Sequence, residues 1–266
     1  MPVYRLGRDP VFPPPGGATV DGIVAIGGDV TPRRLRAAYQ AGIFPWPVEG
    51  YPLLWFSPDP RSALVPADLR VSRSLRKRLR REPFRVTSDL AFEAVMRACA
   101  ETPRAGQRGT WITDELIEGY IGLHREGIAH SVEAWHGDTL VGGLYGVSLG
   151  AAFFGESMFT RVPDASKVAF VRLVTQLDAW GFHFIDCQVQ TAHLDRFGAT
   201  AWPRARFLAA LDRALACPTR AGPWTLEPSV AEVLAAGDAP SACPPRGAAR
   251  PSDPASDAPG RSSAAE

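Results

Sequence analysis

Apolar residues recur at helical spacing in several parts of the chain. One helix is predicted to begin after Thr31, an N-cap followed by proline, and to run to about Gln40, where Gly42 stops it. Others are predicted from apolar residues at i, i+3, i+4 and i+7 spacing. These cover residues 72–82, 92–99, 116–123 and 166–180, and a short helix is expected at 193–197.

The segments between the first helices are unusual. Residues 1–20 are rich in proline and glycine and predict an extended leader. Residues 43–47 and 55–61 mix prolines with large apolar side chains, which excludes a helix and predicts loops. Exposed aromatic loops are costly, so both are expected to pack onto the protein or to line a cleft. The N-terminal half is thus predicted to be helical with long loops.

The pattern changes to alternation near Ala129. Residues 131–135 and 139–147 predict two strands of a hairpin, and residues 151–159 predict a third strand. After the helix at 166–180, residues 182–189 predict a fourth strand. Three strands, a helix, a strand and a helix predict an α+β fold, with the fourth strand parallel to the third.

Composition narrows the class of protein. The 266 residues include 29 Lys+Arg, 28 Asp+Glu and 45% hydrophobic residues, enough for one large domain or two smaller ones. The net charge of +1 argues against a strongly basic nucleic-acid binder but allows a local basic patch. There is no signal-peptide pattern, no stretch of 18 apolar residues and no CxxC pair among the four cysteines. These features predict a cytoplasmic protein with reduced thiols.

Two apolar strands are interrupted by polar residues. Asp186 and Gln188 share one face of the strand at 182–189, and a buried carboxylate is costly without a partner. Glu156 interrupts the strand predicted beside it, so the two carboxylates could bind a cationic group or accept a proton. Structural roles stay open at this point. Asp186 could pair with an arginine or cap a loop, Gln188 could satisfy a backbone group, and Glu156 could face solvent.

Cys187, the histidines and the basic segment give weaker indications of a functional site. Cys187 alternates away from Asp186 and is expected to serve packing. The histidines show no i, i+4 pairing, so no metal site is predicted. The helix at 72–82 carries six positive charges within nine residues. Such a run is usually a solvated face, but it is also a good contact site for phosphates.

The α+β order is compatible with an acetyltransferase, but one element is missing. Binding of the coenzyme A pyrophosphate by backbone N–H groups requires a glycine-rich loop at a helix N-terminus. Residues 160–165 contain no glycine and include Pro163. The expected pyrophosphate site is therefore absent from the sequence.

Short motifs along the chain then identify a family. They lie at residues 25–29, 42–46, 55–61, 72–75, 109–112, 123–124, 129–133, 140–147, 155–159, 165–167 and 185–188. On these motifs the chain resembles the bacterial leucyl/phenylalanyl-tRNA–protein transferases from about residue 3 to residue 226. Residues 194–197 depart from the family pattern, which concerns only helix packing.

The resemblance implies a fold and a reaction. It implies a small N-terminal domain at 1–70, with the aromatic loops, and a C-terminal acetyltransferase-like (GNAT-type) catalytic domain at 71–228. Residues 229–266, mostly Ala, Pro, Ser, Gly and Asp, are predicted to be a disordered tail. The implied reaction moves Leu, Phe and, less readily, Met from aminoacyl-tRNA to proteins that begin with Arg or Lys. The products are marked for degradation by the N-end rule pathway.

The aminoacyl ester is already activated, so no cofactor is expected. The expected partners are aminoacyl-tRNA and the acceptor protein, with no membrane and no second subunit. By resemblance, Asp186 and Gln188 are the catalytic pair. Asp186 would draw positive charge or a proton from the acceptor amine, and Gln188 would orient the amine or the ester carbonyl. Glu156 is a second candidate for holding the acceptor N-terminus.

The resemblance also implies binding residues for the donor. Leu144, Phe153 and Met158 match the family's donor side-chain pocket, and Met suits a pocket that accepts two shapes. Trp46 and Trp111 match positions that stack on the terminal adenosine or line its cleft. The basic helix then becomes a candidate site for acceptor-stem phosphates, through Arg76, Lys77 and Arg80.

Two other functions remain open from the sequence. One is a different aminoacyl-tRNA-dependent or acetyl-CoA-dependent N-acyltransferase on the same scaffold, which would need a coenzyme A loop or another acceptor site. The other is a non-catalytic tRNA-binding protein, in which Asp186 and Gln188 could be replaced without loss.

Overall fold

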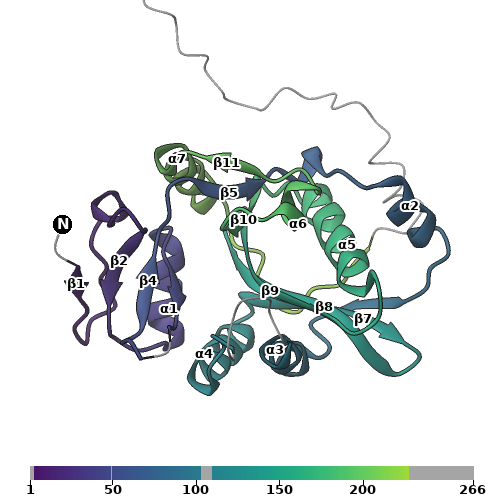
Figure 1. Ribbon diagram of the computed structural model, residues 1–266, viewed down its shortest axis with the longest axis horizontal. Coiled ribbons are helices and arrows are strands. Elements are labelled where there is room, and N and C mark those ends of the chain that lie inside the picture. The colour runs from purple at the N-terminus through teal and green to yellow at the C-terminus, as the bar shows by residue number, and fades with distance from the viewer. Residues whose placement is uncertain (1–2, 49, 103–109, 228–266) are drawn as a thin grey trace, which may run out of the picture.

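The molecule contains two β-sheets that lie side by side along its long axis (Figure 1). A computed structural model describes residues 3–48, 50–102 and 110–227. The predicted tail at 229–266 lies outside the described residues. Among the residues that are described, no helix is long and apolar enough to cross a membrane.

The N-terminal unit is built on a four-stranded sheet in the order β1-β2-β4-β3. Its strands are β1 (Tyr4–Arg5), β2 (Ile23–Ile26), β3 (Phe44–Trp46) and β4 (Leu54–Phe56). Helix α1 (Pro32–Gln40) follows β2, and its predicted bounds are confirmed. A 3-10 turn, η1 (Pro15–Gly17), interrupts the predicted leader.

The prediction that the two aromatic segments are loops is wrong for residues 44–46, 55–56 and 61, which lie in strands, and is confirmed for residues 57–60. Residues 44–46 and 54–56 form β3 and β4, which pair antiparallel. Pro45 is tolerated in β3 because β3 is an edge strand of its sheet, where one row of N–H groups makes no ladder bonds. The other prediction for these segments is confirmed, because Phe44 and Trp55 are buried in the core.

The C-terminal unit is built on a seven-stranded sheet in the order β11-β5-β10-β9-β8-β7-β6. Its strands are β5 (Arg61–Leu64), β6 (Arg85–Ser88), β7 (Ala129–His136), β8 (Thr139–Leu149), β9 (Ala152–Thr160), β10 (Phe184–Gln188) and β11 (Thr200–Trp202). The β7–β8 hairpin is confirmed, and β10 pairs parallel to β9 as predicted. The α+β class is therefore confirmed.

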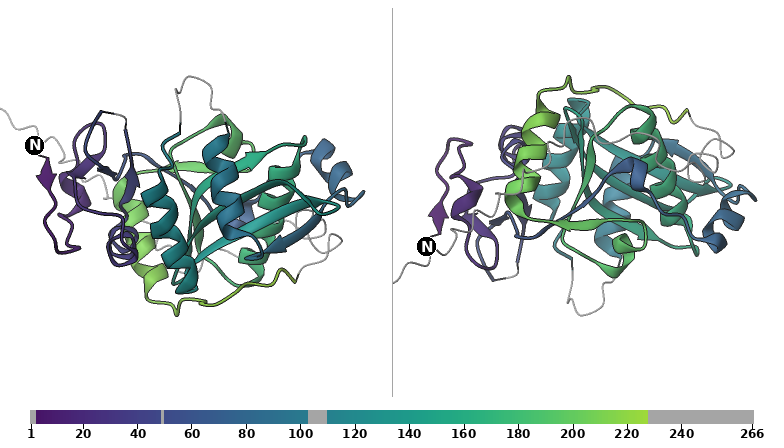
Figure 2. Two further views of the ribbon diagram at one scale, coloured as in Figure 1. Left: turned by 90° about the horizontal axis from the view of Figure 1, so that it is seen from below. Right: turned by 90° about the horizontal axis from the view of Figure 1, so that it is seen from above.

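Helices cover both faces of this sheet (Figures 1 and 2). Helix α5 (Ala165–Ala179) packs on β7, β8 and β9 from one side. Helices α3 (Phe92–Glu101) and α4 (Asp114–Arg125) pack from the other side. The remaining elements are α2 (Arg73–Leu79), η2 (Pro66–Asp68), α6 (Ala192–Asp195) and α7 (Arg204–Leu215).

The prediction of a helical N-terminal half is also wrong, because β1 to β6 all precede residue 89. Strand β5 joins the larger sheet although it lies before residue 70. Strands β6 and β11 and helix α7 were not predicted. Strand β6 is an edge strand with Arg85, Thr87 and Ser88, so its sequence lacks the apolar alternation of a buried strand.

The two units share one core at the contact of α1 with α4. A Cβ atom on Gly119 would lie 2.1 Å from the carbonyl oxygen of Val30, and one on Gly122 would lie 2.4 Å from Cγ of Pro32. Only glycine at these positions allows α4 to approach the start of α1 this closely. The close contact fixes the N-terminal unit against the larger sheet, and it positions the cavities described below.

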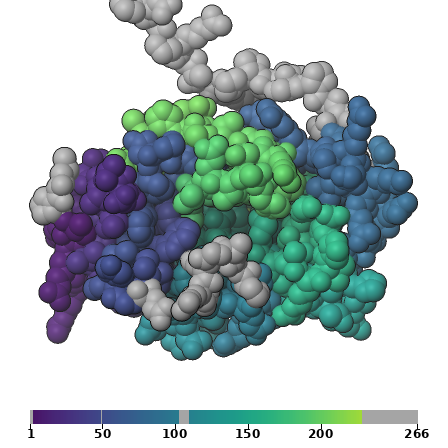
Figure 3. Space-filling view, viewed as in Figure 1, coloured from purple at the N-terminus to yellow at the C-terminus, as the bar shows by residue number. Residues whose placement is uncertain are grey.

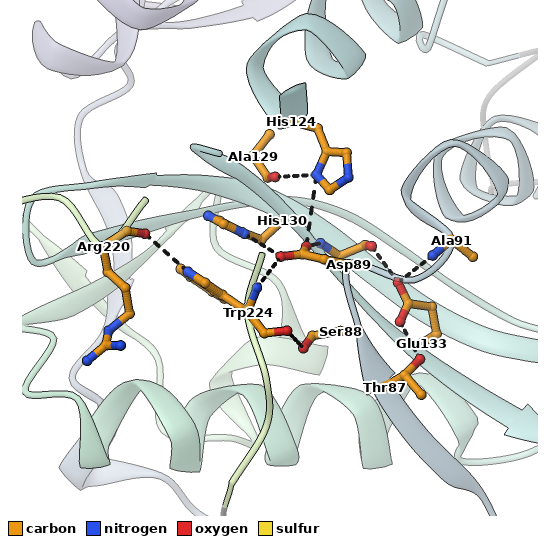
Figure 4. A network of polar contacts seen from close by, with 11 residues as sticks. Thr87, Ser88, Asp89, Ala91, His124, Ala129, His130, Glu133, Arg220 and Trp224 are labelled. Carbon is orange, nitrogen blue, oxygen red and sulfur yellow. Dashed lines mark hydrogen bonds and ion pairs between the residues drawn. The ribbon is translucent and has the colours of Figure 1, made fainter. Parts of the chain in front are cut away.

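A buried network attaches the segment after α7 to the sheet (Figure 4). The Asp89 carboxylate accepts hydrogen bonds from His130 Nδ1 (2.8 Å), from the Ser131 backbone N–H (3.0 Å) and from the Trp224 backbone N–H (2.7 Å). The rings of His130 and Trp224 stack with their centroids 3.6 Å apart. We call Asp89, His130, Ser131 and Trp224 the anchor network, because they hold residue 224 against β7.

Candidate functional site

A cavity of about 300 Å³ opens where β9 and β10 meet α6. Seven of the predicted site residues line it, namely Trp46, Trp111, Leu144, Phe153, Glu156, Met158 and Gln188. They come from β3, β8, β9, β10 and the segment before α4. The structure thus brings together residues that are more than 140 positions apart in the chain.

One side of the cavity is apolar. Leu144 and Met158 are cross-strand partners on β8 and β9, and Phe153 lies on the same sheet face. Phe170 of α5 and Ile185 of β10 complete this side. The half-buried Met158 can adapt its shape because it is unbranched and flexible. This wall can hold an apolar side chain of the size of Leu or Phe.

A pair of tryptophans separates this cavity from a larger one. The rings of Trp46 and Trp111 stack with centroids 5.6 Å apart and an angle of 24° between their planes. Both also line a cavity of about 1230 Å³ between the N-terminal unit and α4. Thr113, Glu115 and Tyr51 are among its polar lining residues. A ligand could therefore extend from one cavity to the other along two indole faces.

Glu156 is the acidic group that faces the smaller cavity. Gln188 Nε2 donates to its Oε1 at 2.7 Å, and the Tyr120 hydroxyl donates to its Oε2 at 3.0 Å. Burial raises the pKa of Glu156 from 4.5 to about 7, against the opposing effect of hydrogen bonds from Tyr39 and Tyr120. Asp186 nearby raises it further. Glu156 can therefore take up and release a proton near neutral pH.

Asp186 has a different environment. Its side chain is fully buried and does not line the cavity. Arg61 donates to both carboxylate oxygens, through Nε to Oδ1 at 2.8 Å and through Nη2 to Oδ2 at 2.6 Å. Pairing with an arginine was the structural alternative that the sequence left open. Asp186 is thus an acceptor whose two oxygens are already engaged.

Gln188 ends the strand irregularly. Its φ is +61°, and the pairing of β10 with β5 shifts register between Asp186 and Gln188. The Gln188 backbone N–H donates to Asp186 Oδ1 at 2.9 Å. The predicted regular alternation therefore breaks at this residue. Its amide side chain points to Glu156, and the amide oxygen remains as an acceptor.

Sequence reasoning missed three residues of this region. Tyr39 and Tyr120 are fully buried, their hydroxyls hydrogen-bond to each other, and burial raises the pKa of both well above 10. They lie on α1 and α4, where helical periodicity marks them only as core positions. Arg61 lies in the segment predicted as a loop. Two prolines and an aspartate before it gave no indication of a buried ion pair.

The predicted phosphate-binding residues lie elsewhere. Arg76, Lys77 and Arg80 are on or directly after α2, at the end of the molecule away from the N-terminal unit (Figure 3). They line neither cavity. Lys77 and Arg80 are exposed, and Arg76 Nε donates to the Val71 carbonyl at 3.2 Å. The structure therefore does not bring α2 and the cavity residues into one site.

Cysteine and metal chemistry have little support in the described part of the chain. Cys187 lines the cavity, and burial raises the pKa of its thiol, which makes the reactive thiolate scarce. Cys99, Cys187 and Cys217 are free, and Cys243 lies outside the described residues. No group of three or more His, Cys, Asp or Glu residues among those described could hold a metal ion.

Two family models match the chain. One, described as leucyl/phenylalanyl-tRNA protein transferase, matches residues 63–212. The other, described as the N-terminal domain of leucyl/phenylalanyl-tRNA protein transferase, matches residues 28–59. Residues 60–62 separate the two matches, and β5, the first strand of the larger sheet along the chain, begins within this gap.

Curated proteins match over most of their length. A leucyl/phenylalanyl-tRNA–protein transferase of Anaeromyxobacter dehalogenans (strain 2CP-C) is 61% identical over 227 residues, covering 85% of this chain and 97% of the relative. The protein of that name from Myxococcus xanthus (strain DK1622) is 59% identical with the same coverage. One from Oleidesulfovibrio alaskensis is 53% identical over 231 residues, covering 85% of this chain and 93% of the relative.

Proposed function

The chain belongs to the leucyl/phenylalanyl-tRNA–protein transferase family, and from this premise we propose its substrates and the roles of its residues. The donor is Leu-, Phe- or, less readily, Met-tRNA, and the acceptor is a protein that begins with Arg or Lys. The product enters N-end rule degradation. The enzyme works in the cytoplasm as a monomer and without a cofactor.

The observation that carries this proposal is the convergence of an apolar wall, a titratable carboxylate and two stacked indoles on one cavity. The donor side chain occupies the wall of Leu144, Phe153 and Met158. The terminal adenosine lies along Trp46 and Trp111 toward the larger cavity, because aromatic faces stack on unpaired bases. This arrangement leaves the ester carbonyl close to Glu156 and Gln188.

Attack on the ester carbonyl requires that the acceptor α-amine be neutral. An α-ammonium group has a reference pKa of about 7.7–8.0, close to the pKa of about 7 of Glu156. Glu156 attracts the ammonium group and takes one proton from it. The amine attacks the carbonyl carbon, the new C–N bond forms, and the ester C–O bond breaks. Of the two protons left on the amine nitrogen, one passes to the departing ribose oxygen and the other stays as the N–H of the new amide.

Gln188 orients the amine through its amide oxygen, because its Nε2 is engaged with Glu156. Asp186 acts through Gln188 as a fixed negative charge, since it is buried and does not line the cavity. The basic face of α2, with Arg76, Lys77 and Arg80, contacts phosphates of the tRNA acceptor stem. The domain limits at residues 70 and 228 and the acetyltransferase-like label remain part of the proposal.

One assay tests this function. Labelled Phe-tRNA is incubated with a peptide that begins with Arg, and with matched peptides that begin with Lys, Asp or Glu. Transfer to the Arg and Lys peptides alone is expected. Transfer to none of them would contradict the acceptor assignment, and transfer from acetyl-CoA instead would indicate a different acyltransferase.

A second assay tests the catalytic pair. Gln188→Ala and Asp186→Asn should both lose most of the transfer activity. If Asp186→Asn kept full transfer to the Arg peptide with an unchanged pH profile, the proposed role of its charge would be wrong.

A further inference from the structure

Arg61 is a charged residue at the start of β5, between β11 and β10 in the larger sheet, and its side chain has no exposed surface. It lies on β5, which pairs with β10 so that Ala63 faces Asp186 and Ser62 faces Gln188. A buried guanidinium and a buried carboxylate each lose several kcal/mol of hydration. Their presence beside the proposed site therefore requires a compensating geometry.

Hydrogen bonds and aromatic rings surround the Arg61 guanidinium. The guanidinium makes two parallel hydrogen bonds to Asp186 and a third, from Nη1, to the Gly42 carbonyl at 3.3 Å. The rings of Phe44 and Phe207 cover it, each 4.6 Å from Cζ. Its edge and its faces are thus occupied, so the guanidinium has one orientation. A planar bidentate donor cannot be replaced by a lysine ammonium.

The same carboxylate controls the backbone at Gln188. Asp186 Oδ1 accepts from Arg61 Nε and from the Gln188 N–H. The left-handed φ of +61° at Gln188 is unfavourable for a residue with a side chain, by about 1–2 kcal/mol. The hydrogen bond to Asp186 compensates for this. A continuous chain of contacts therefore runs from Arg61 through Asp186 and Gln188 to Glu156 in the cavity wall.

We propose that Arg61 is a positioning residue for aminoacyl transfer. It fixes the Asp186 carboxylate, which in turn holds the left-handed turn at Gln188 and keeps the amide directed at Glu156. Arg61 lines neither cavity, so its effect on the reaction passes through Asp186. The proposal rests on the proposed function of the smaller cavity.

The test compares Arg61→Lys, Asp186→Asn and the double variant Arg61→Gln/Asp186→Asn. Arg61→Lys keeps the charge but loses the bidentate geometry. We expect its kcat for transfer to an Arg-starting peptide to fall about 100-fold, as small misplacements of reacting groups do. The KM for Phe-tRNA should stay within about two-fold, because the donor cavity does not contact Arg61.

A matched control is available in Arg34, another fully buried arginine, which donates to the Gly7 and Arg8 carbonyls. Arg34→Lys should lower the melting temperature without a selective loss of kcat. The double variant replaces both charged groups by neutral amides, so no unpaired charge is left buried. It can therefore be assayed even if Arg61→Lys fails to fold. Its kcat should equal that of Asp186→Asn within about three-fold, because the two residues act as a unit.

Two outcomes would overturn the proposal. One is a folded Arg61→Lys variant with normal kcat. The other is a double variant whose kcat is far below that of Asp186→Asn. If the unaltered enzyme transfers no Phe at all, the proposed function itself fails, which distinguishes that failure from the failure of the Arg61 role.

Discussion

Two buried carboxylates, Asp89 directly after β6 and Asp186 on β10, have different hydrogen-bond partners. The Asp89 carboxylate accepts hydrogen bonds from N–H groups of His130, Ser131 and Trp224. The rings of His130 and Trp224 stack on each other and are buried. Asp186 accepts a bidentate guanidinium and one N–H, and its contacts continue to a group that lines a cavity. We call Arg61, Asp186, Gln188 and Glu156 the site network.

The two networks differ in whether they reach a cavity. In the anchor network every contact holds one segment of chain against another, and nothing faces open space. In the site network the last group, Glu156, is half-buried and titrates near neutral pH. Trp224 also contacts the apolar wall of the smaller cavity, since its ring centroid lies 5.9 Å from that of Phe153. The comparison predicts separable effects on stability and on activity.

The largest expected effect is on stability, at Asp89. Asp89→Ala leaves three buried N–H donors without their acceptor and places alanine at a φ of +56°. The free energy of unfolding should fall by about 3–5 kcal/mol, measured by urea titration. Asp89→Asn is the matched control and should lose less, because asparagine tolerates this φ and keeps one acceptor oxygen. The kcat of folded Asp89→Asn should remain normal; a selective loss of kcat would remove the distinction between the networks.

The next effect is on activity, at Glu156. Glu156→Gln should lower kcat/KM at pH 7.5 about 100-fold, because the carboxylate that is proposed to take the proton is then replaced by a neutral amide. The rise of the rate through about pH 7 should disappear, leaving only the titration of the acceptor amine. Glu133→Gln is the control, since Glu133 is buried beside the anchor network and bonded to Thr87. An identical pH profile in both variants would contradict the role of Glu156.

The same variant should change the pH dependence of stability. Because the pKa of Glu156 is raised from 4.5 to about 7, the folded protein keeps a proton that the unfolded chain loses between these values. The stability from this group is complete below pH 4.5 and is lost as the pH rises through 7. Glu156→Gln should therefore reduce the drop in unfolding free energy between pH 5 and pH 8 by about 2 kcal/mol. An unchanged or larger drop would show that the carboxyl group does not titrate in this range.

A smaller effect is expected in the donor wall, outside both networks. Leu144→Phe adds volume opposite Met158. Transfer of Phe should fall about ten-fold relative to transfer of Leu, because pockets discriminate added carbons by about 1–3 kcal/mol. The ratio of kcat/KM for the two donors measures this and cancels any general loss of stability. An unchanged ratio would place donor selection elsewhere.

The smallest effect is expected on α2, far from either network. Replacing Arg76, Lys77 and Arg80 by Ala should weaken tRNA binding a few-fold at low salt. The slope of log K against log salt should decrease by about one for each phosphate that the variant no longer neutralises. Stability and the pH profile should not change. If the salt slope is the same as in the unaltered enzyme, α2 is only a solvated face.

Much of the fold could be predicted from local patterns. The bounds of α1 follow from Thr31, Pro32 and Gly42, and the β7–β8 hairpin follows from alternation around a short turn. The parallel pairing of β9 with β10 follows from the helix between them. The segments 44–46 and 54–56 could not be assigned in this way. Their proline and aromatic content resembles a loop, and only pairing with each other and with β2 makes them strands.

The candidate site also combines features that the sequence predicts with features that only the tertiary structure shows. The amino-acid sequence alone determined which residues are candidates, because polar groups in apolar strands and ordered motifs are local features that can be read directly. Only the tertiary structure decided that Arg61 holds Asp186, that Tyr39 and Tyr120 contact Glu156, and that α2 lies apart from the cavities. These pairings join positions up to 125 residues apart. No periodicity specifies such a partner, because the choice depends on how sheets and helices pack once most of the chain has folded.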